Sequence, residues 1–166
     1  MSFYRIHACE NDGQQIICPS VTFDLDRGGR FDWPHDEPTH AAKKSQKLYD
    51  WLEGNCWAPF VNSKIKTRLE PATGSTVQWH GPFDVRGNSY FHLNCVDVVD
   101  CLLPGSDDNI LLLNKAAVAD RCLFRVMGRA PRLFCSQAFR DNCVNSGDTG
   151  VRFGRIKEDG WEDFPF

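Results

Sequence analysis

The polar residues with the best spacing for chemistry lie in one proline-rich stretch. His35 is followed directly by Asp36, and His40 comes five residues after His35. Pro34 and Pro38 prevent a regular helix there, so these side chains are expected on a loop. A carboxylate beside an imidazole can tune a general base or help to bind a metal ion. We keep this loop as the basis of an alternative function, a small cytosolic enzyme or an accessory binding module.

The remaining polar clusters form no recognisable catalytic centre. No Gly-x-Ser-x-Gly elbow is present to activate a serine nucleophile. The run Arg27-Gly28-Gly29-Arg30 offers backbone amides to a phosphate, but the Lys-Ser/Thr pair of phosphate-binding loops does not follow it. Asp24 and Asp26 would share one face of a strand and could hold a cation, yet no third ligand can be named. From the residues alone we expect no catalytic residue, no cofactor and no bound metal.

Eight cysteines raise the question of disulfide bonds or zinc. The first residues of the sequence lack a charged region followed by an apolar run, so we expect no secretory signal and a cytoplasmic protein. Thiols stay reduced in the cytosol. No Cys-x-x-Cys pair occurs, although that spacing is typical of structural zinc sites. We therefore expect small, buried, reduced side chains at Cys9, Cys18, Cys56, Cys95, Cys101, Cys122, Cys135 and Cys143.

Length and charge limit the classes of partner. With 166 residues the chain fits a single domain, residues 1–166, with an N-terminal portion (1–75) and a sheet-rich C-terminal portion (76–156). The net charge is −3 and the sequence shows no basic face, so we expect no nucleic-acid partner. No apolar run reaches the ~18 residues of a membrane helix, so we expect no membrane partner. A mildly acidic chain more naturally meets a basic protein, and homo-oligomerisation is left open.

The segment 132–153 predicts a strand, a short helix, a tight turn and a second strand. The hydroxyl of Ser136 can accept from the free amides of a new helix. Phe139 and Cys143 lie four residues apart on one face of that helix, with Val144 beside them. A glycine then suits the left-handed residue that ends the helix. We expect this segment to be a packing unit that closes a sheet.

The rest of the chain alternates short strands with turns. Thr39 can cap a helix over residues 40–53. The segment 56–69 fits either a strand or a loop that leads into a short helix, and the segment 70–75 predicts a turn. A single helical turn is expected over 116–120. Strands are expected over 3–8, 14–18, 76–80, 89–103, 110–113 and 121–127, the second pairing back on the first. This pattern predicts an α+β fold, a mostly antiparallel sheet with two or three helices in a single domain.

Three blocks of sequence resemble one known family. The first runs from Tyr90 to Leu102 and the second is Leu123-Phe124-Arg125. The third holds Phe134-Cys135-Ser136, Phe139 and then Thr149-Gly150-Val151-Arg152-Phe153. In order and spacing they resemble the eleventh immunity-protein family of bacterial polymorphic-toxin systems, earlier described as a domain of unknown function. The blocks span about two-fifths of the chain, and the N-terminal half matches only vaguely.

The resemblance implies a cytosolic antidote that binds the C-terminal domain of a cognate toxin and blocks it without turnover. It assigns no catalytic residue. The sequence adds two acidic segments, the loop 104–109 and the tail 157–166, and the tail also holds aromatic residues. Their carboxylates would speed the encounter with a basic toxin, and the aromatic side chains would anchor the contact. The expected partner-binding residues are Asp107, Asp108, Glu158, Asp159, Trp161, Glu162, Asp163 and Phe164.

Overall fold

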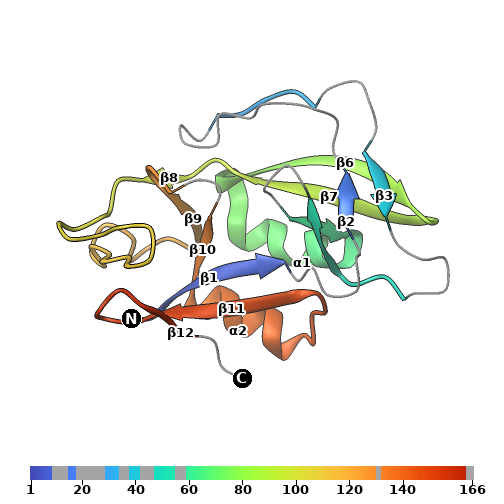
Figure 1. The fold of residues 1–166 in the computed structure, drawn as a ribbon. Helices are drawn as coiled ribbons and strands as arrows, with labels where there is room; N and C mark the ends of the chain where they lie inside the picture. The colour runs from blue at the N-terminus through green and yellow to red at the C-terminus, as the bar shows by residue number, and fades with distance from the viewer. Residues whose placement is uncertain are drawn as a thin grey trace.

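The fold pairs two β-sheets with two α-helices in one α+β domain, as the sequence predicts (Figure 1). The computed structural model describes residues 1–8, 15–17, 29–33, 38–41, 47–54, 59–129 and 132–163, and the structural statements below concern this part of the chain. Both sheets turn one face to a common core, and some of their strands are buried on the other face as well. Short connections join some of the paired strands, and these pairs are antiparallel.

The first sheet is built around the N-terminal strand. Its strand order is β12-β11-β1-β10-β9-β8, and among its described strands only the pair β8–β9 is parallel. The prediction of a strand over 3–8 is confirmed by β1, which pairs with β10 on one side and with β11 on the other. The strands are β1 (Phe3–Ala8), β8 (Val98–Val99), β9 (Leu123–Val126), β10 (Leu133–Ser136), β11 (Val151–Ile156) and β12 (Glu162–Asp163).

The second sheet has the order β3-β2-β4-β5-β7-β6, and its only parallel pair among the described residues is β2–β4. The expected strand at 14–18 is present as β2, but it pairs with β3 and β4 and not with β1, so that predicted pairing is wrong. The strands are β2 (Gln15–Ile17), β3 (Thr39–Ala41), β4 (Trp51–Gly54), β5 (Phe60–Asn62), β6 (Val77–Val85) and β7 (Asn88–Cys95).

One hydrophobic core joins the two sheets and both helices. Tyr4 and Ile6 of β1 meet Trp51 of β4 in this core, and each of the three is buried. A fully buried large apolar side chain stabilises the fold by about 1.5–3 kcal/mol, so this shared core holds the sheets as one unit. The helices α1 (Ser63–Thr73) and α2 (Gln137–Asn145) contribute Ile65, Leu69, Phe139 and Cys143.

A second cluster lies on the other face of the first sheet. Phe3 and Phe124 meet edge to face there, with ring centroids 5.8 Å apart. The long connection between β8 and β9 covers them and buries Leu111 and Val118. Within that connection the expected strand at 110–113 is reduced to a single bridge between Leu102 and Leu113. The connection is therefore held by packing more than by sheet pairing.

The C-terminal packing unit forms as predicted. The hydroxyl of Ser136 accepts from the backbone N–H of Phe139 at 3.3 Å and caps α2. Phe139 and Cys143 are buried, whereas Val144 is exposed, so the expectation that Val144 shares their face is wrong. Gly147 has a positive φ of 69° just after the helix, which a residue without Cβ adopts readily.

The predicted helix over 40–53 is wrong. Residues 39–41 are strand β3 and residues 51–54 are strand β4. Trp51 enters the shared core while its neighbour Leu52 enters a third cluster on the opposite face of the sheet. A strand buried on both faces shows no polar alternation, and its adjacent apolar residues imitate the face of a helix.

Four other sequence-based expectations differ from the structure. Residues 70–75 are not a turn, because α1 continues to Thr73 with Pro71 in its last turn.

The expected strand at 76–80 continues to Val85 through an irregularity between His80 and Phe83, at the cis peptide bond between Gly81 and Pro82. The expected long strand over 89–103 is two strands, since β7 belongs to the second sheet and β8 to the first. Residues 116–120, where a single helical turn is expected, form non-helical turns.

Candidate functional site: a surface formed by two distant segments

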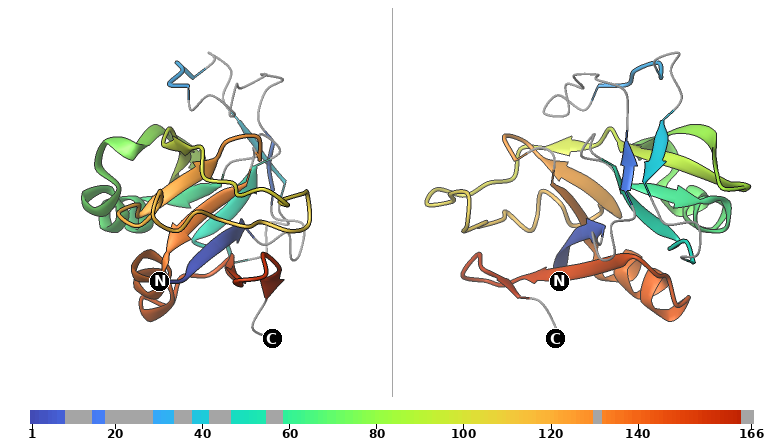
Figure 2. Two further views of the ribbon diagram at one scale, coloured as in Figure 1. Left: turned by 90° about the vertical axis from the view of Figure 1, so that its left-hand side faces the viewer. Right: turned by 45° about the vertical axis from the view of Figure 1, so that its right-hand side comes forward.

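The two acidic segments predicted from the sequence lie side by side at one end of the molecule (Figures 1 and 2). One is the loop 103–112, and the other is the hairpin 157–163 that connects β11 to β12. The backbone N–H of Leu111 donates to the carbonyl of Gly160 at 2.9 Å and joins them. Gly160 has a φ of +83°, and a Cβ there would lie 2.7 Å from a methyl carbon of Ile110. We call this joint region the two-segment surface.

Local hydrogen bonds fix the shape of the loop. The Asp107 Oδ1 atom accepts from the backbone N–H of Asn109 at 2.7 Å and from that of Ile110 at 2.8 Å. These two bonds lower the pKa of Asp107 below its usual value, because they favour the ionised carboxylate. Asp108, next to it, is 88% exposed. The loop therefore presents one carboxylate used in its own turn and one that faces solvent.

The hairpin presents an aromatic side chain in the same way. The backbone N–H of Lys157 donates to the carbonyl of Trp161 at 2.9 Å and closes the hairpin. Asp159 Oδ1 accepts from the backbone N–H of Trp161 at 3.1 Å. The indole of Trp161 is thereby held on an ordered turn with 52% of the residue exposed. An aromatic residue presented on an ordered backbone is a typical anchor of a protein interface.

Most carboxylates of the two-segment surface have a cation nearby. Lys115 lies 3.1 Å from Glu158, and Arg129 lies 3.9 Å from Asp108. Lys157 lies 3.7 Å from Asp163. Exposed ion pairs of this kind are weak and screened by salt, so a partner can replace them at low cost. The surface is nonetheless less acidic than the sequence suggests.

Glu162 differs from the other predicted binding residues because its side chain is used inside the molecule. Only 17% of that side chain is exposed. Its Oε1 atom lies 2.5 Å from Nε2 of His7, and its Oε2 atom lies 3.3 Å from a guanidinium nitrogen of Arg5. It ties β12 to β1 across β11, so its first role is to hold the hairpin in place.

Two exposed apolar side chains adjoin the acidic residues. Leu103 begins the loop and is 44% exposed. Met127, 48% exposed, lies two residues before Arg129, which approaches Asp108. With Trp161, they make three of the six large hydrophobic side chains that are exposed in the described part of the chain. Apolar side chains among polar ones are the composition of a protein-binding surface more than of a catalytic site.

The remaining predicted residues are not placed. His35, Asp36 and Phe164 lie outside the described residues, so the structure gives no geometry for the alternative loop site. The backbone of His40 lies in β3. Asp24, Asp26, Arg27 and Gly28 also fall outside the described ranges. The alternative function therefore stays an expectation from the sequence.

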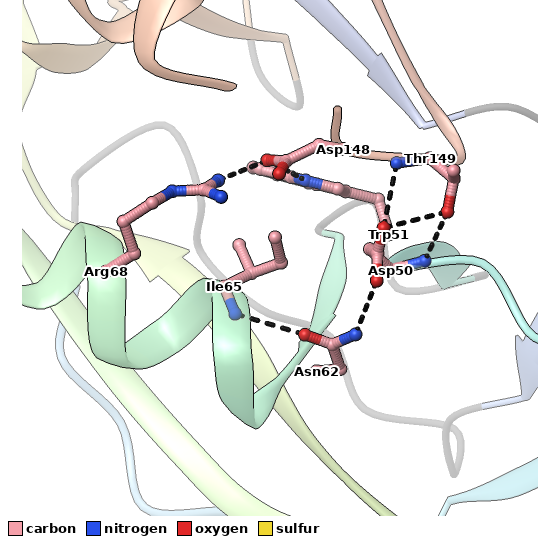
Figure 3. A network of polar contacts seen from close by, with 7 residues as sticks. All are labelled: Asp50, Trp51, Asn62, Ile65, Arg68, Asp148 and Thr149. Carbon is pink, nitrogen blue, oxygen red and sulfur yellow. Dashed lines mark hydrogen bonds and ion pairs between the residues drawn. The ribbon is translucent and has the colours of Figure 1, made fainter. Parts of the chain in front are cut away.

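The structure also shows a polar network that sequence reasoning missed (Figure 3). Asp148, whose side chain is fully buried, accepts from the guanidinium of Arg68 and from the indole N–H of Trp51, the latter at 3.2 Å. Beside it, Thr149 donates its backbone N–H to Asp50 at 3.0 Å and receives the Asp50 N–H on its hydroxyl at 3.0 Å. The network links the turn before β11 to α1 and β4.

The charges of this network are stabilised by hydrogen bonds. Burial alone would raise the pKa of Asp50, but hydrogen bonds from Thr149 and Asn62 hold it below its usual value. Asn62 also caps α1 by accepting from the backbone N–H of Ile65 at 3.0 Å. The hydrogen bonds of the network run from the turn before β11 in the first sheet to α1 and to β4 in the second sheet, which is a structural role. The residues that it joins across the sheets are 80 to 99 positions apart in sequence, so no local pattern reveals it.

Two buried histidines lie between β6, β7 and the segment 29–33. The rings of His80 and His92 are 5.5 Å apart, and Phe31 stacks on His80 at 4.4 Å. Burial lowers the pKa of His80, and burial also lowers the pKa of His92, where the positive charge of Arg125 adds to the effect. These imidazoles are neutral packing residues at neutral pH. In the described ranges no group of three metal-ligating side chains is placed to hold an ion.

The five described cysteines are free thiols, and none is activated as a nucleophile. Burial raises the pKa of Cys95 and of Cys143 to about 12, and that of Cys101 to about 11. Burial likewise raises the pKa of Cys122 and of Cys135. A thiol needs a lowered pKa to react at neutral pH. Cys9, Cys18 and Cys56 lie outside the described residues.

Comparison with known proteins identifies no family. No protein-family model matches the chain, and no curated protein matches it. The described helices include none that is long and apolar enough to cross a membrane. The family resemblance of the three sequence blocks therefore stays an expectation.

Proposed function

We propose that this protein is an immunity protein, a stoichiometric inhibitor that binds the C-terminal domain of a cognate bacterial toxin through the two-segment surface. It acts in the cytoplasm, needs no cofactor and performs no chemistry. The observation that carries this proposal is the joining of two acidic segments, about 50 residues apart, around the exposed indole of Trp161. Aromatic anchors surrounded by polar residues dominate the binding energy of protein interfaces.

The distribution of charge supports a role in encounter as well as in contact. Asp108 is 88% exposed and Glu158 is 92% exposed, so both carboxylates are available to a basic partner. Each would exchange a weak contact with Arg129 or Lys115 for a contact with the toxin. Such rim charges act mainly on the association rate, whereas a buried aromatic anchor acts mainly on the dissociation rate.

The decisive experiment is coexpression and co-purification with the C-terminal domain of a long delivered protein encoded immediately upstream, if one is present. We expect a stable complex at near-equal stoichiometry and restored growth. A trace of this protein that protects against a large excess of toxin would show turnover and contradict the proposal. In that case His35, Asp36 and His40 would be the first residues to replace.

The surface itself is tested by variants that change charge without breaking the turns. Asp107→Asn and Asp159→Asn keep the oxygen that accepts the backbone hydrogen bonds, and Asp108→Lys and Glu158→Lys change exposed positions. We expect slower association at low salt for the two lysine variants and a smaller difference at high salt, since the screening length is about 8–10 Å near physiological ionic strength. Glu70→Lys, at an exposed position of α1 where the carboxylate likewise pairs with one lysine, is the control.

The anchor is tested separately. Trp161→Ala should raise the dissociation rate with little change in association, because the indole contributes contact area and not charge. Val144→Ala removes another exposed apolar side chain, on α2, and should leave both rates unchanged. Equal effects of the two substitutions would remove Trp161 from the interface.

A further inference from the structure

Arginine side chains gather on the outer face of the first sheet. In β1, Arg5 and His7 alternate with Tyr4 and Ile6, and the latter two face the shared core. Successive side chains of a strand point to opposite faces. Arg5 and His7 therefore point away from the core, to the same face as Phe3 of the second cluster.

The strand register places an arginine on each side of His7. Arg152 of β11 lies directly opposite His7, and directly opposed residues of antiparallel strands share a face. On the other side, Ile6 pairs with Leu133, so Arg132, one residue earlier, lies beside His7. One further arginine comes from the turn before β10. We call the set the arginine patch: Arg5, Arg129, Arg132 and Arg152.

The arginine patch holds more positive charge than its nearby carboxylates balance. Glu162 lies 3.3 Å from Arg5, and Asp108 lies 3.9 Å from Arg129. Across the described residues, no carboxylate forms an ion pair with the other two arginines. Burial lowers the pKa of Arg132, and the charges of Arg5 and Arg129 lower it further, against the opposite effect of Asp108 and Glu162. The region is therefore electropositive although the chain is acidic as a whole.

A carboxylate of the chain already occupies part of this patch. Glu162 reaches Arg5 and His7 by lying over Gly154, which pairs with Arg5. A Cβ on Gly154 would collide with the Glu162 carboxylate, so the absence of a side chain there makes room for the anion. The patch thus contains a built position for one oxyanion, filled from within the molecule.

We propose that the arginine patch binds a small phosphorylated ligand whose phosphoryl oxygens displace the Glu162 carboxylate. Guanidinium groups pair with phosphate through two parallel hydrogen bonds, and a phosphoryl group can accept from more of them than one carboxylate can. The row Arg152–His7–Arg132 spans three strands, about 10 Å at the usual strand spacing. That width fits one or two phosphates. This proposal does not rest on toxin binding, although it shares Glu162 and Asp108 with the two-segment surface.

The test is calorimetric titration of the whole protein with inorganic pyrophosphate at neutral pH, against sodium chloride of matched ionic strength. We expect saturable binding at one site. Arg132→Gln and Arg152→Gln should each weaken it by about tenfold or more, the usual value of one charge-assisted hydrogen bond. Glu162→Gln should tighten it, because the internal competitor is removed. Arg155→Gln, on the opposite face of β11, removes the same charge and should change affinity by less than about twofold.

Each other outcome counts against the proposal. The proposal would be overturned if the heats of pyrophosphate injection equalled those of the chloride blank. Equal losses of affinity in Arg155→Gln and Arg152→Gln would also overturn it. Acetate that binds as tightly as pyrophosphate would assign the patch to carboxylates, and a single-stranded oligonucleotide that binds more tightly would assign it to a polymer. Circular dichroism checks the fold of each variant, and if Arg132→Gln fails to fold, the exposed Arg152 carries the test.

Discussion

Phe139 is the residue on which the C-terminal packing unit most depends. Its ring is buried in the core that both sheets share. Phe139→Ala should lower the free energy of unfolding by about 3–5 kcal/mol, because it removes a large buried side chain and leaves a cavity. Denaturant melts measure this change. Val144→Ala on the exposed face of the same helix is the control and should cost less than about 0.5 kcal/mol. A loss below about 1 kcal/mol for Phe139→Ala would contradict the packing described.

The buried histidines predict an acid-sensitive stability. Burial lowers the pKa of His80 and of His92 in the folded chain, whereas the unfolded value is about 6.5. Above that pH both states are neutral. Below it the unfolded chain binds protons that the folded chain does not, so the free energy of unfolding should fall by up to about 1.4 kcal/mol per pH unit for each histidine.

Urea melts between about pH 6.5 and 5.5 test this, since carboxylates with ordinary pKa values titrate mainly below that range. The double variant His80→Gln/His92→Gln should show a flatter pH dependence than the unaltered protein. An equal slope in both proteins would show that other groups control the acid response.

At the scale of elements, the network around Asp148 determines how the sheets dock. Asp148→Ala should cost about 3 kcal/mol, because it leaves the Arg68 guanidinium and the Trp51 N–H without their buried acceptor. The magnitude is at the lower end for a buried pair, since 21% of the Arg68 side chain is exposed. Asp141→Ala, an exposed carboxylate on α2, is the matched control and should change little. A small loss for Asp148→Ala in thermal melts would show that the shared core alone docks the sheets.

Elements with strong local signals could be predicted from the sequence, and elements shaped by tertiary burial could not. The strand β1 and the unit β10–α2–β11 follow from period-two alternation and from the Ser136 cap. The strand β4 was missed because Trp51 and Leu52 are buried on its two faces. The break between β7 and β8 was missed because the chain changes sheets there, which no local pattern marks.

The candidate site shows the same division. The types of residue in the acidic segments could be chosen from the sequence, but their joining through Leu111 and Gly160 could not, because it is a contact between distant backbones. The arginine patch was missed for a related reason. Its members are scattered along the chain, and only the strand register brings Arg152 opposite His7.

At the scale of the whole molecule, the thiols should all be reduced in the purified protein. The five described cysteines are free, and burial raises the pKa of each, which suppresses oxidation. Intact mass with and without reductant, together with metal analysis, checks all eight cysteines. A loss of about two mass units for each bond, or stoichiometric zinc, would contradict the expectation.

The hydrogen bond from Leu111 to Gly160 has a consequence for thermodynamic linkage. The two halves of the surface come together only when the chain is folded, so an isolated peptide of residues 157–163 should compete poorly for any partner bound there. A partner that recognises the joined surface binds the native state alone. Such a partner must raise the melting temperature in a concentration-dependent way. At a free concentration of about one hundred times Kd, it adds about 2.7 kcal/mol to the free energy of unfolding.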